Sequence, residues 1–148
     1  MTHTSTKQLH LQQPLVYTKE LSGSLPCHEA YDLLLEQLSQ APIGTDALLA
    51  CKALLTADLY SVSCLAAYYR FPDDTSPAIN TVEAGSYLFY QMPFAPTEGK
   101  HLMPLLNRFA TDFNYSQVKE HPFSIRLYKE RQFEVTVQFI APIRTIQG

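Results

Sequence analysis

The sequence contains an apparent internal repeat, because three elements of its first half recur in the same order about 70 residues later. Each copy consists of a strand-like run, an amphipathic helix and a hairpin-like stretch. Two such strand-helix-strand-strand units would form an α+β domain with antiparallel sheets, helices on one side, and a groove at the pseudo-two-fold seam. The segments are residues 15–20, 27–40 and 52–71 in the first copy, and 86–92, 100–113 and 123–141 in the second.

The length of 148 residues suits one domain, which at this size buries about two thirds of the unfolded surface. Residues 1–12 are rich in polar side chains, with little apolar area to offset the entropy of ordering, so we expect a flexible N-terminal tail. Proline, aspartate and serine between the two copies predict a linker. We therefore expect a single domain over 13–148, divided into repeat one (13–71), the linker (72–80) and repeat two (81–143).

Both expected helices carry an apolar stripe at helical spacing. Pro104 complicates the second helix, because proline lacks an N–H group and clashes with the preceding turn. The regular helix therefore begins near Met103 or kinks there. The stripes consist of Tyr31, Leu34, Leu35 and Leu38 in the first helix, and of Leu102, Leu106, Phe109 and Phe113 in the second.

The strand patterns differ between the two copies. Residues 133–139 alternate between apolar and polar side chains, which is typical of a strand with one buried face. Residues 61–69 alternate less regularly, with Val62, Cys64 and Ala66 on one face. Residues 47–55 are rich in Ala and Leu and by propensity favour a helix, but the repeat requires a strand in their later half.

The opposite faces of these strands mix aromatic and polar side chains. If the helices cover the faces of Cys64 and Val137, the other faces line a shared concavity. Aromatic rings with a few polar groups are the usual composition of a small-molecule pocket. The alternative is a solvated face whose rings reflect strand propensity alone. The candidate ligand-binding residues are Tyr69, Tyr90, Arg126, Tyr128 and Glu134.

Residues 83–90 (EAGSYLFY), 125–128 (IRLY) and 139–143 (FIAPI) resemble motifs of the GyrI-like effector-binding domains. The resemblance implies two strand-helix-strand-strand modules that bind small molecules, either alone or as the ligand domain of transcription regulators. Members that bind cationic drugs place a glutamate two residues before the tyrosine of the penultimate strand, where this chain has Arg126. An arginine repels cations, so a neutral or anionic ligand is expected unless Glu134 neutralises Arg126.

Composition argues against several classes of function. A net charge of −3 with scattered cations gives no electrostatic footprint for nucleic acid. The apolar runs are shorter than the roughly 18 residues of a membrane span. The N-terminus lacks the apolar core of a secretion signal, so a cytoplasmic location is expected. The expected partners are a small-molecule ligand or an unidentified protein, with no cofactor.

Catalytic and metal sites receive little support from the sequence. Cys27 and His28 start a helix, where a thiol can be activated, but adjacent helical residues point about 100° apart. We therefore interpret the three cysteines as buried thiols, and the histidines show no metal-ligand spacing. Tyr128 and Glu134 could act as an acid–base pair, although a salt bridge from Glu134 to Arg126 across the hairpin is favoured.

Three hypotheses follow from these observations. The leading one is a non-enzymatic small-molecule-binding protein of GyrI-like type. The second is an adaptor or inhibitor that uses the same fold to contact another protein. The third is a hydrolase of small reactive molecules. An open groove favours the first, whereas a filled groove with an exposed apolar patch elsewhere favours the second.

Overall fold

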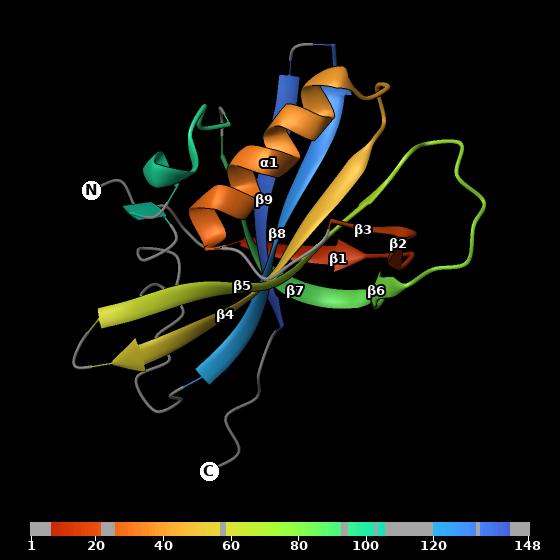
Figure 1. The fold of residues 1–148 in the computed structure, drawn as a ribbon. Helices are drawn as coiled ribbons and strands as arrows, with labels where there is room; N and C mark the ends of the chain where they lie inside the picture. The colour runs from red at the N-terminus through yellow and green to blue at the C-terminus, as the bar shows by residue number, and fades with distance from the viewer. Residues whose placement is uncertain are drawn as a thin grey trace.

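The computed structural model describes residues 7–21, 26–56, 59–92, 95–102, 104–105, 120–132 and 134–142. Within these ranges the chain forms mostly strands and one α-helix, which confirms the α+β class (Figure 1). The elements are β1 (Lys7–Leu11), β2 (Leu15–Tyr17), β3 (Lys19–Leu21), α1 (Cys27–Gln40), β4 (Asp46–Thr56), β5 (Leu59–Arg70), β6 (Asn80–Val82), β7 (Gly85–Gln91), the 3-10 turn η1 (Gly99–His101), β8 (Glu120–Arg131) and β9 (Glu134–Pro142).

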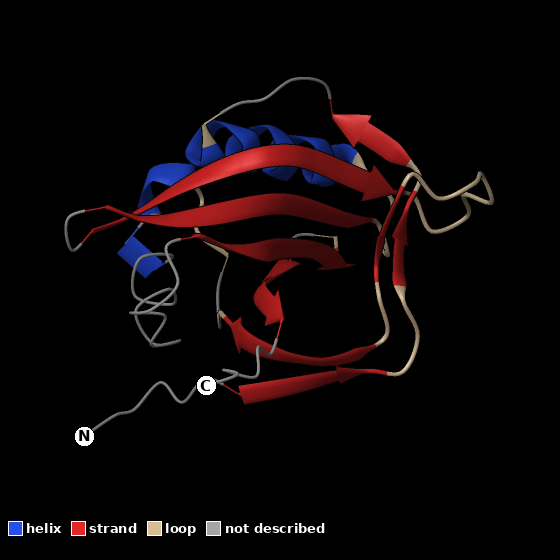
Figure 2. Ribbon diagram, turned by 90° about the horizontal axis from the view of Figure 1, so that it is seen from below, coloured by secondary structure: helices blue, strands red, loops and turns tan. Residues whose placement is uncertain are grey.

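Seven of the described strands form one antiparallel sheet in the order β1-β7-β9-β8-β4-β5-β3. Its centre is the pairing of β4 with β8, which joins Asp46 to Tyr128. Strands β2 and β6 form a separate two-stranded sheet. The large sheet is strongly curved, and α1 lies across one of its faces (Figure 2). The predicted hairpins are confirmed as β4–β5 and β8–β9.

The N-terminal segment reaches both edges of the large sheet, since β1 lies at one edge and β3 at the other. Eight residues from Leu11 to Lys19 span at most about 29 Å, and six inter-strand spacings in a flat sheet amount to about the same distance. Strand β2, which lies between β1 and β3 in the sequence, pairs with β6 outside the large sheet, so the segment cannot run straight from one edge to the other. The two edges of the large sheet must therefore curl toward each other. The expected strand over residues 15–20 is thus divided at Thr18.

The prediction of a flexible tail over residues 1–12 is wrong for residues 7–11. These residues form β1, which pairs with β7 from Lys7 opposite Phe89 to Leu11 opposite Gly85. The ladder supplies backbone hydrogen-bond partners that the polar composition does not reveal. Residues 1–6 lie outside the described part of the chain.

Helix α1 begins and ends where the sequence predicts, and it buries Tyr31, Leu34 and Leu38 against the sheet. At its C-terminus, Lys129 of β8 donates hydrogen bonds from Nζ to the carbonyl oxygens of Ser39 (3.2 Å) and Ala41 (2.7 Å). These carbonyls have no partner within the helix, and the negative end of the helix dipole favours a cation. Lys129 therefore caps α1 from inside the core. No helix among the described residues has both the length and the apolar character needed to cross a membrane.

The second predicted helix is described only at its start. Residues 99–101 form the turn η1, and residues 104–105 are helical, whereas 103 and 106–113 lie outside the described residues. Gly99 touches α1 so closely that a Cβ atom would come within 2.1 Å of the His28 carbonyl oxygen. Its N–H group donates to Asp32 Oδ1 at 2.6 Å. A glycine at this position thus allows η1 to pack directly on α1.

A β-bulge in β5 changes which side chains face the core. Cys51 pairs with Cys64 and Ala50 with Ala66, so Leu65 is an extra residue on β5 and is 57% exposed. One extra residue reverses the alternation beyond it. The prediction that Ala66 lies on the helix face is therefore wrong, because its partner Ala50 belongs to the other face. The core under α1 instead contains, from strands β4, β5, β8 and β9, residues such as Ala47, Leu49, Ala67, Leu127, Val137 and Phe139.

Candidate functional site

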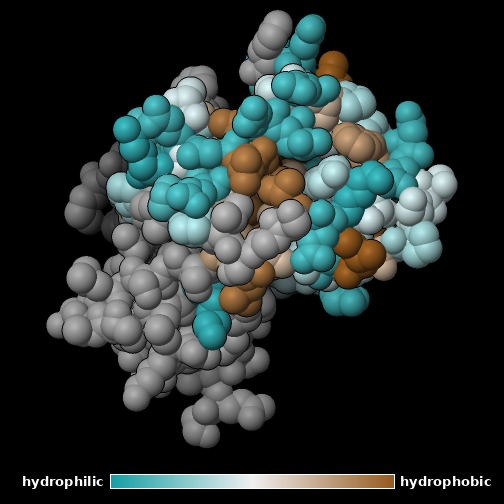
Figure 3. Space-filling view, viewed as in Figure 1, coloured by the Kyte–Doolittle hydropathy of each residue, from teal (hydrophilic) through white to brown (hydrophobic). Residues whose placement is uncertain are grey.

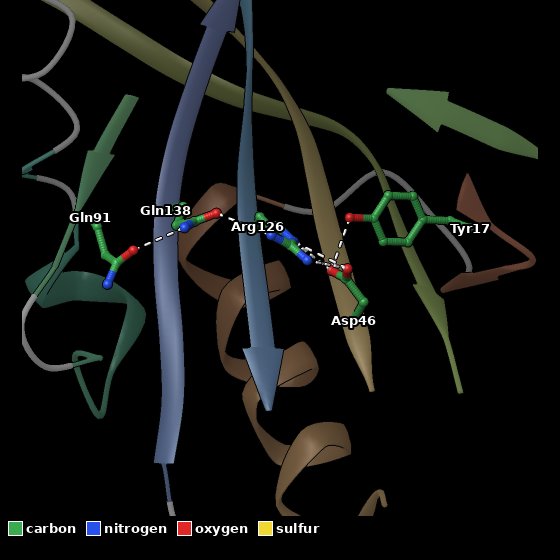
Figure 4. Close-up of polar contacts among 5 residues, drawn as sticks. All are labelled: Tyr17, Asp46, Gln91, Arg126 and Gln138. Carbon is green, nitrogen blue, oxygen red and sulfur yellow. Dashed lines mark hydrogen bonds and ion pairs between the residues drawn. The ribbon is translucent and has the colours of Figure 1, made fainter. Parts of the chain in front are cut away.

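A row of polar side chains crosses the sheet face opposite α1. Arg126 of β8 lies directly opposite Gln138 of β9, and Gln138 lies opposite Gln91 of β7. Arg126 alternates with the core residues Ile125 and Leu127, so its side chain points away from α1. Asp46 of β4 reaches it from one side, and Tyr17 of β2 lies beyond Asp46 (Figure 4). Five strands thus contribute to one polar network.

The centre of this network is the ion pair of Arg126 and Asp46. Arg126 donates from Nε to Oδ1 and Oδ2, both at 3.1 Å, and from Nη2 to Oδ2 at 2.8 Å. The side chains are only 20% and 17% exposed, so water screens the pair weakly. Burial lowers the pKa of Arg126, but the hydrogen bonds and charge of Asp46 outweigh it and raise this pKa above its ordinary value. The guanidinium therefore stays charged and is neutralised by Asp46.

Tyr17 is fully buried and donates from its hydroxyl to Asp46 Oδ1 at 2.9 Å. Burial, together with the negative charge of Asp46, raises the pKa of Tyr17 well above its ordinary value. The phenol thus remains a hydrogen-bond donor at any physiological pH. Asp46 is fixed by two partners that come from different sheets.

The two glutamine amides are oriented by Arg126. Arg126 Nη1 donates to Gln138 Oε1 at 3.3 Å, and Gln138 Nε2 donates to Gln91 Oε1 at 2.9 Å. Because arginine can only donate, Gln138 turns its oxygen toward it and its nitrogen toward Gln91. Gln91 then ends the row with donor N–H groups. Asp46 and Gln138 accept from three of the five N–H groups of Arg126. The Tyr17 hydroxyl also interacts with the guanidinium.

The structure brings together two of the five predicted site residues, Arg126 and Tyr128. The guanidinium carbon lies 5.1 Å from the centroid of the Tyr128 ring, within the range of a cation–π contact. Tyr128 pairs with Asp46 and Thr136, so it lies on the same sheet face as Arg126. Arg126 and Tyr128 thus form a local cluster on this face.

Tyr69 and Tyr90 lie on the other face, partly buried against the core under α1. Tyr69 pairs with Ala47 because the bulge has reversed its side, and its ring meets the Phe71 ring edge-on at 5.5 Å. Tyr90 pairs with the core residue Phe139, with ring centroids 6.1 Å apart. The sheet itself separates both tyrosines from Arg126, so the predicted concavity does not contain them.

Glu134 lies at the end of the β8–β9 hairpin and is 61% exposed. Its carboxylate is 3.8 Å from Nε of Arg131, which is also exposed. The predicted salt bridge from Glu134 to Arg126 is therefore wrong, because Asp46 holds that arginine. An irregularity between Lys129 and Arg131 places Glu134 opposite Arg131 instead.

The sequence analysis missed Asp46, Tyr17 and Gln91. One sequence feature pointed to Asp46, because it is a single acid directly before the Ala- and Leu-rich run 47–55. An isolated carboxylate at the start of a buried strand needs a partner. Tyr17 and Gln91 had no comparable signal, because their partners lie 29 and 47 positions away in the chain.

A separate depression of about 460 Å³ lies between the outer side of α1 and residues 97–100. Its charged groups are engaged locally: Asp32 accepts from Gly99, and Lys100 lies 3.0 Å from Glu98. Seen from this side, hydrophilic residues surround a small group of hydrophobic ones (Figure 3). In the described part of the chain, no group of three or more His, Cys, Asp or Glu residues is arranged to hold a metal ion. The depression is lined by His28, Asp32, Leu35, Glu36, Ser39, Thr97, Glu98 and Lys100.

Comparisons with protein-family models, with curated proteins and with solved structures found no match for this chain. The resemblance to GyrI-like domains therefore stays a prediction based on the sequence motifs.

Proposed function

We propose that the protein binds a small neutral or anionic molecule on the sheet face opposite α1, at Arg126 and Tyr128, without converting it chemically. One observation carries the proposal: a mostly buried guanidinium is fixed by Asp46 and Gln138, which accept from three of its five N–H groups. Binding sites typically combine a few oriented polar groups with aromatic surface. Tyr128 provides such a surface next to the guanidinium.

The order of the strands supports a GyrI-like duplicated module. The first half contributes β3, β5 and β4 in adjacent positions, and the second contributes β7, β9 and β8 in the same relative order. A pseudo-two-fold axis between β4 and β8 relates two such units. These strands are joined over nine residue pairs, so we place the ligand on the face of a continuous sheet rather than in a gap at the seam.

The hydrogen-bonding groups define the ligand class. Asp46 neutralises Arg126, so the site does not depend on a fully charged anion. Arg126 offers only N–H donors, and the row ends at Gln91 with N–H donors as well. A ligand with carbonyl or carboxylate oxygens can accept from them, whereas a cation offers no acceptor and meets a guanidinium. We therefore expect an acceptor-rich molecule with a ring or other flat apolar part.

A binding role without catalysis agrees with the contacts of the polar groups. Asp46 is the carboxylate that contacts the guanidinium, and its oxygens accept hydrogen bonds from Arg126 and Tyr17. Glu134, the other acid considered, lies at the exposed hairpin end. A general base must reach the proton that it removes, and neither carboxylate is placed for this.

The experiment is a thermal-shift screen with three sets of compounds: aromatic carboxylates, neutral aromatic amides and aromatic amines. Ligand at about 100 times its Kd stabilises a protein by about 2.7 kcal/mol, which is readily measured. We expect shifts from the first two sets, lost in Arg126→Gln and retained in the control Arg131→Gln. Arg131 has the same charge on the same strand but is 77% exposed.

Two results would contradict the proposal. One is a shift that is as large with the amines as with the carboxylates and amides. The other is stabilisation that persists in a folded Arg126→Gln variant. A protein that responds to no small molecule but forms a stoichiometric complex with another protein would support the adaptor hypothesis instead.

A further inference from the structure

The three cysteines of the chain converge on the core side of the sheet, although they belong to α1, β4 and β5. Cys27 Sγ lies 4.0 Å from Cys51 Sγ, and Cys51 is directly opposite Cys64 in the β4–β5 ladder. All three are free thiols with at most 4% of their surface exposed. The sequence prediction of buried thiols is confirmed, but it did not indicate that they meet.

The surroundings make the three thiols unequal. Hydrogen bonds to Cys27 and Cys64, together with burial, raise the pKa of Cys51. The hydrogen bond from Cys51 lowers the pKa of Cys64. Thiolates rather than thiols attack oxidants, so Cys64 is the more reactive of this pair and Cys51 is its neighbour. Leu65, the exposed bulge residue, follows Cys64 directly in β5.

We propose that Cys64 and Cys51 form a peroxide-sensitive redox pair that closes a cross-strand disulfide. Opposite residues of an antiparallel ladder have Cα atoms about 4.5 to 5.5 Å apart, and a disulfide accepts about 4.4 to 6.8 Å. The pair can therefore be bridged without separating the strands. A bridge between Cys27 and Cys51, whose sulfur atoms lie 4.0 Å apart, would instead tie α1 to the sheet and is the alternative to be distinguished.

The reaction proceeds in two steps. The Cys64 thiolate attacks one oxygen of hydrogen peroxide, the O–O bond breaks, and the other oxygen leaves as hydroxide, which takes up a proton to become water. Cys64 is thereby oxidised to a sulfenic acid. The Cys51 sulfur then attacks the Cys64 sulfur, the S–O bond breaks, and the hydroxyl group leaves with the Cys51 proton as a second water. Two thiols and one peroxide thus give one disulfide and two waters.

Trypsin digestion distinguishes the possible disulfides. Cys27 and Cys51 share the tryptic peptide 20–52, whereas Cys64 lies in the peptide 53–70. After one equivalent of hydrogen peroxide on the folded protein, we expect titratable thiols to fall from three to one. Peptides 20–52 and 53–70 should become linked, and dithiothreitol should separate them. The same link in Cys27→Ser assigns it to Cys51 and Cys64.

Two variants complete the test. In Cys64→Ser, the link between the peptides should be lost. In Cys51→Ser, a dimedone adduct should collect on Cys64, because the proposed resolving thiol has been removed. The proposal is overturned if peptide 20–52 closes on itself through Cys27, or if wild type and folded Cys27→Ser keep all their thiols. It is equally overturned if Cys64 becomes a sulfinic acid while Cys51 stays reduced.

Discussion

Arg126 and Asp46 form a side-on ion pair on the sheet face opposite α1, although 80 positions separate them in the chain. The contact is possible because β4 and β8 are neighbours at the centre of the sheet. Both side chains are at most one fifth exposed, so losing one partner leaves the other charge poorly solvated. The pair thus differs from the exposed pair of Arg131 and Glu134 at the end of the β8–β9 hairpin.

Removing Asp46 should destabilise the protein strongly. We expect Asp46→Ala to lower the free energy of unfolding by about 2 to 4 kcal/mol, because it leaves a mostly buried guanidinium unpaired. Urea unfolding measures this change. The control Glu134→Gln breaks an exposed pair and should cost less than about 1 kcal/mol. Equal costs for the two variants would show that the Arg126–Asp46 pair contributes no more than a surface contact.

Losing the cap that Lys129 provides should weaken α1 at its C-terminus. Lys129→Met keeps the apolar part of the side chain but removes the donors to Ser39 and Ala41, which we expect to cost about 1 to 3 kcal/mol. Amide hydrogen exchange should increase first in the last turn of α1. Lys100→Met removes an exposed lysine and serves as the control. Unchanged exchange in that turn would contradict the capping role.

The bulge at Leu65 predicts which positions near it tolerate substitution or deletion. Leu65→Ser should change the free energy of unfolding by only about 0.5 kcal/mol, because the side chain is exposed. Leu49→Ala, at a fully buried position of the paired strand, should cost about 2 to 5 kcal/mol. Deleting Leu65 should leave a cooperative fold, because Cys64 stays opposite Cys51 and Ala66 opposite Ala50, so that Ala67 and Tyr69 keep their side of the sheet. A deletion variant that no longer unfolds cooperatively would contradict the assignment of Leu65 as the extra residue.

Asp74 should give the loop after β5 a stability contribution that depends on acid pH. Hydrogen bonds from Thr18 and Ser76 lower its pKa from 3.8 to about 2. A pKa lowered by folding stabilises the protein above the unfolded value, and this contribution is lost as the pH falls from about 4 to 2. An NMR titration of the Asp74 carboxyl should show the low pKa in wild type. In Thr18→Val it should rise toward the ordinary value, and no change would contradict the contact.

Local patterns predicted the elements that depend on local interactions. The bounds of α1 follow from a stripe of 3.6-residue period, and β8–β9 follows from the alternation of Ile125 and Leu127 with polar neighbours. The Ala/Leu-rich strand β4 contradicts its helix propensity because partners on both sides, β5 and β8, fix it in the sheet. Strand β1 was missed because its partner β7 comes more than 70 positions later.

The candidate site was predicted only where side chains alternate regularly between the two faces of the sheet. Arg126 and Tyr128 precede the irregularity near Arg131, so their common face followed from the alternation. Tyr69 follows the bulge at Leu65, and a bulge leaves no clear mark in a single sequence. Asp46 could be recognised as an acid in need of a partner, but its partner depended on which strands are adjacent. The pairing of distant strands is the information that the local pattern lacks.

The N-terminal segment that reaches both sheet edges also sets an order of assembly on the ribosome. Strands β1 and β3 are synthesised first, yet β3 needs β5 and β1 needs β7 before either can pair. The centre of the sheet likewise waits for β8. Within this sequence, the segment made first is therefore among the last to pair, and its backbone stays open to chaperones until β5 and β7 have been synthesised.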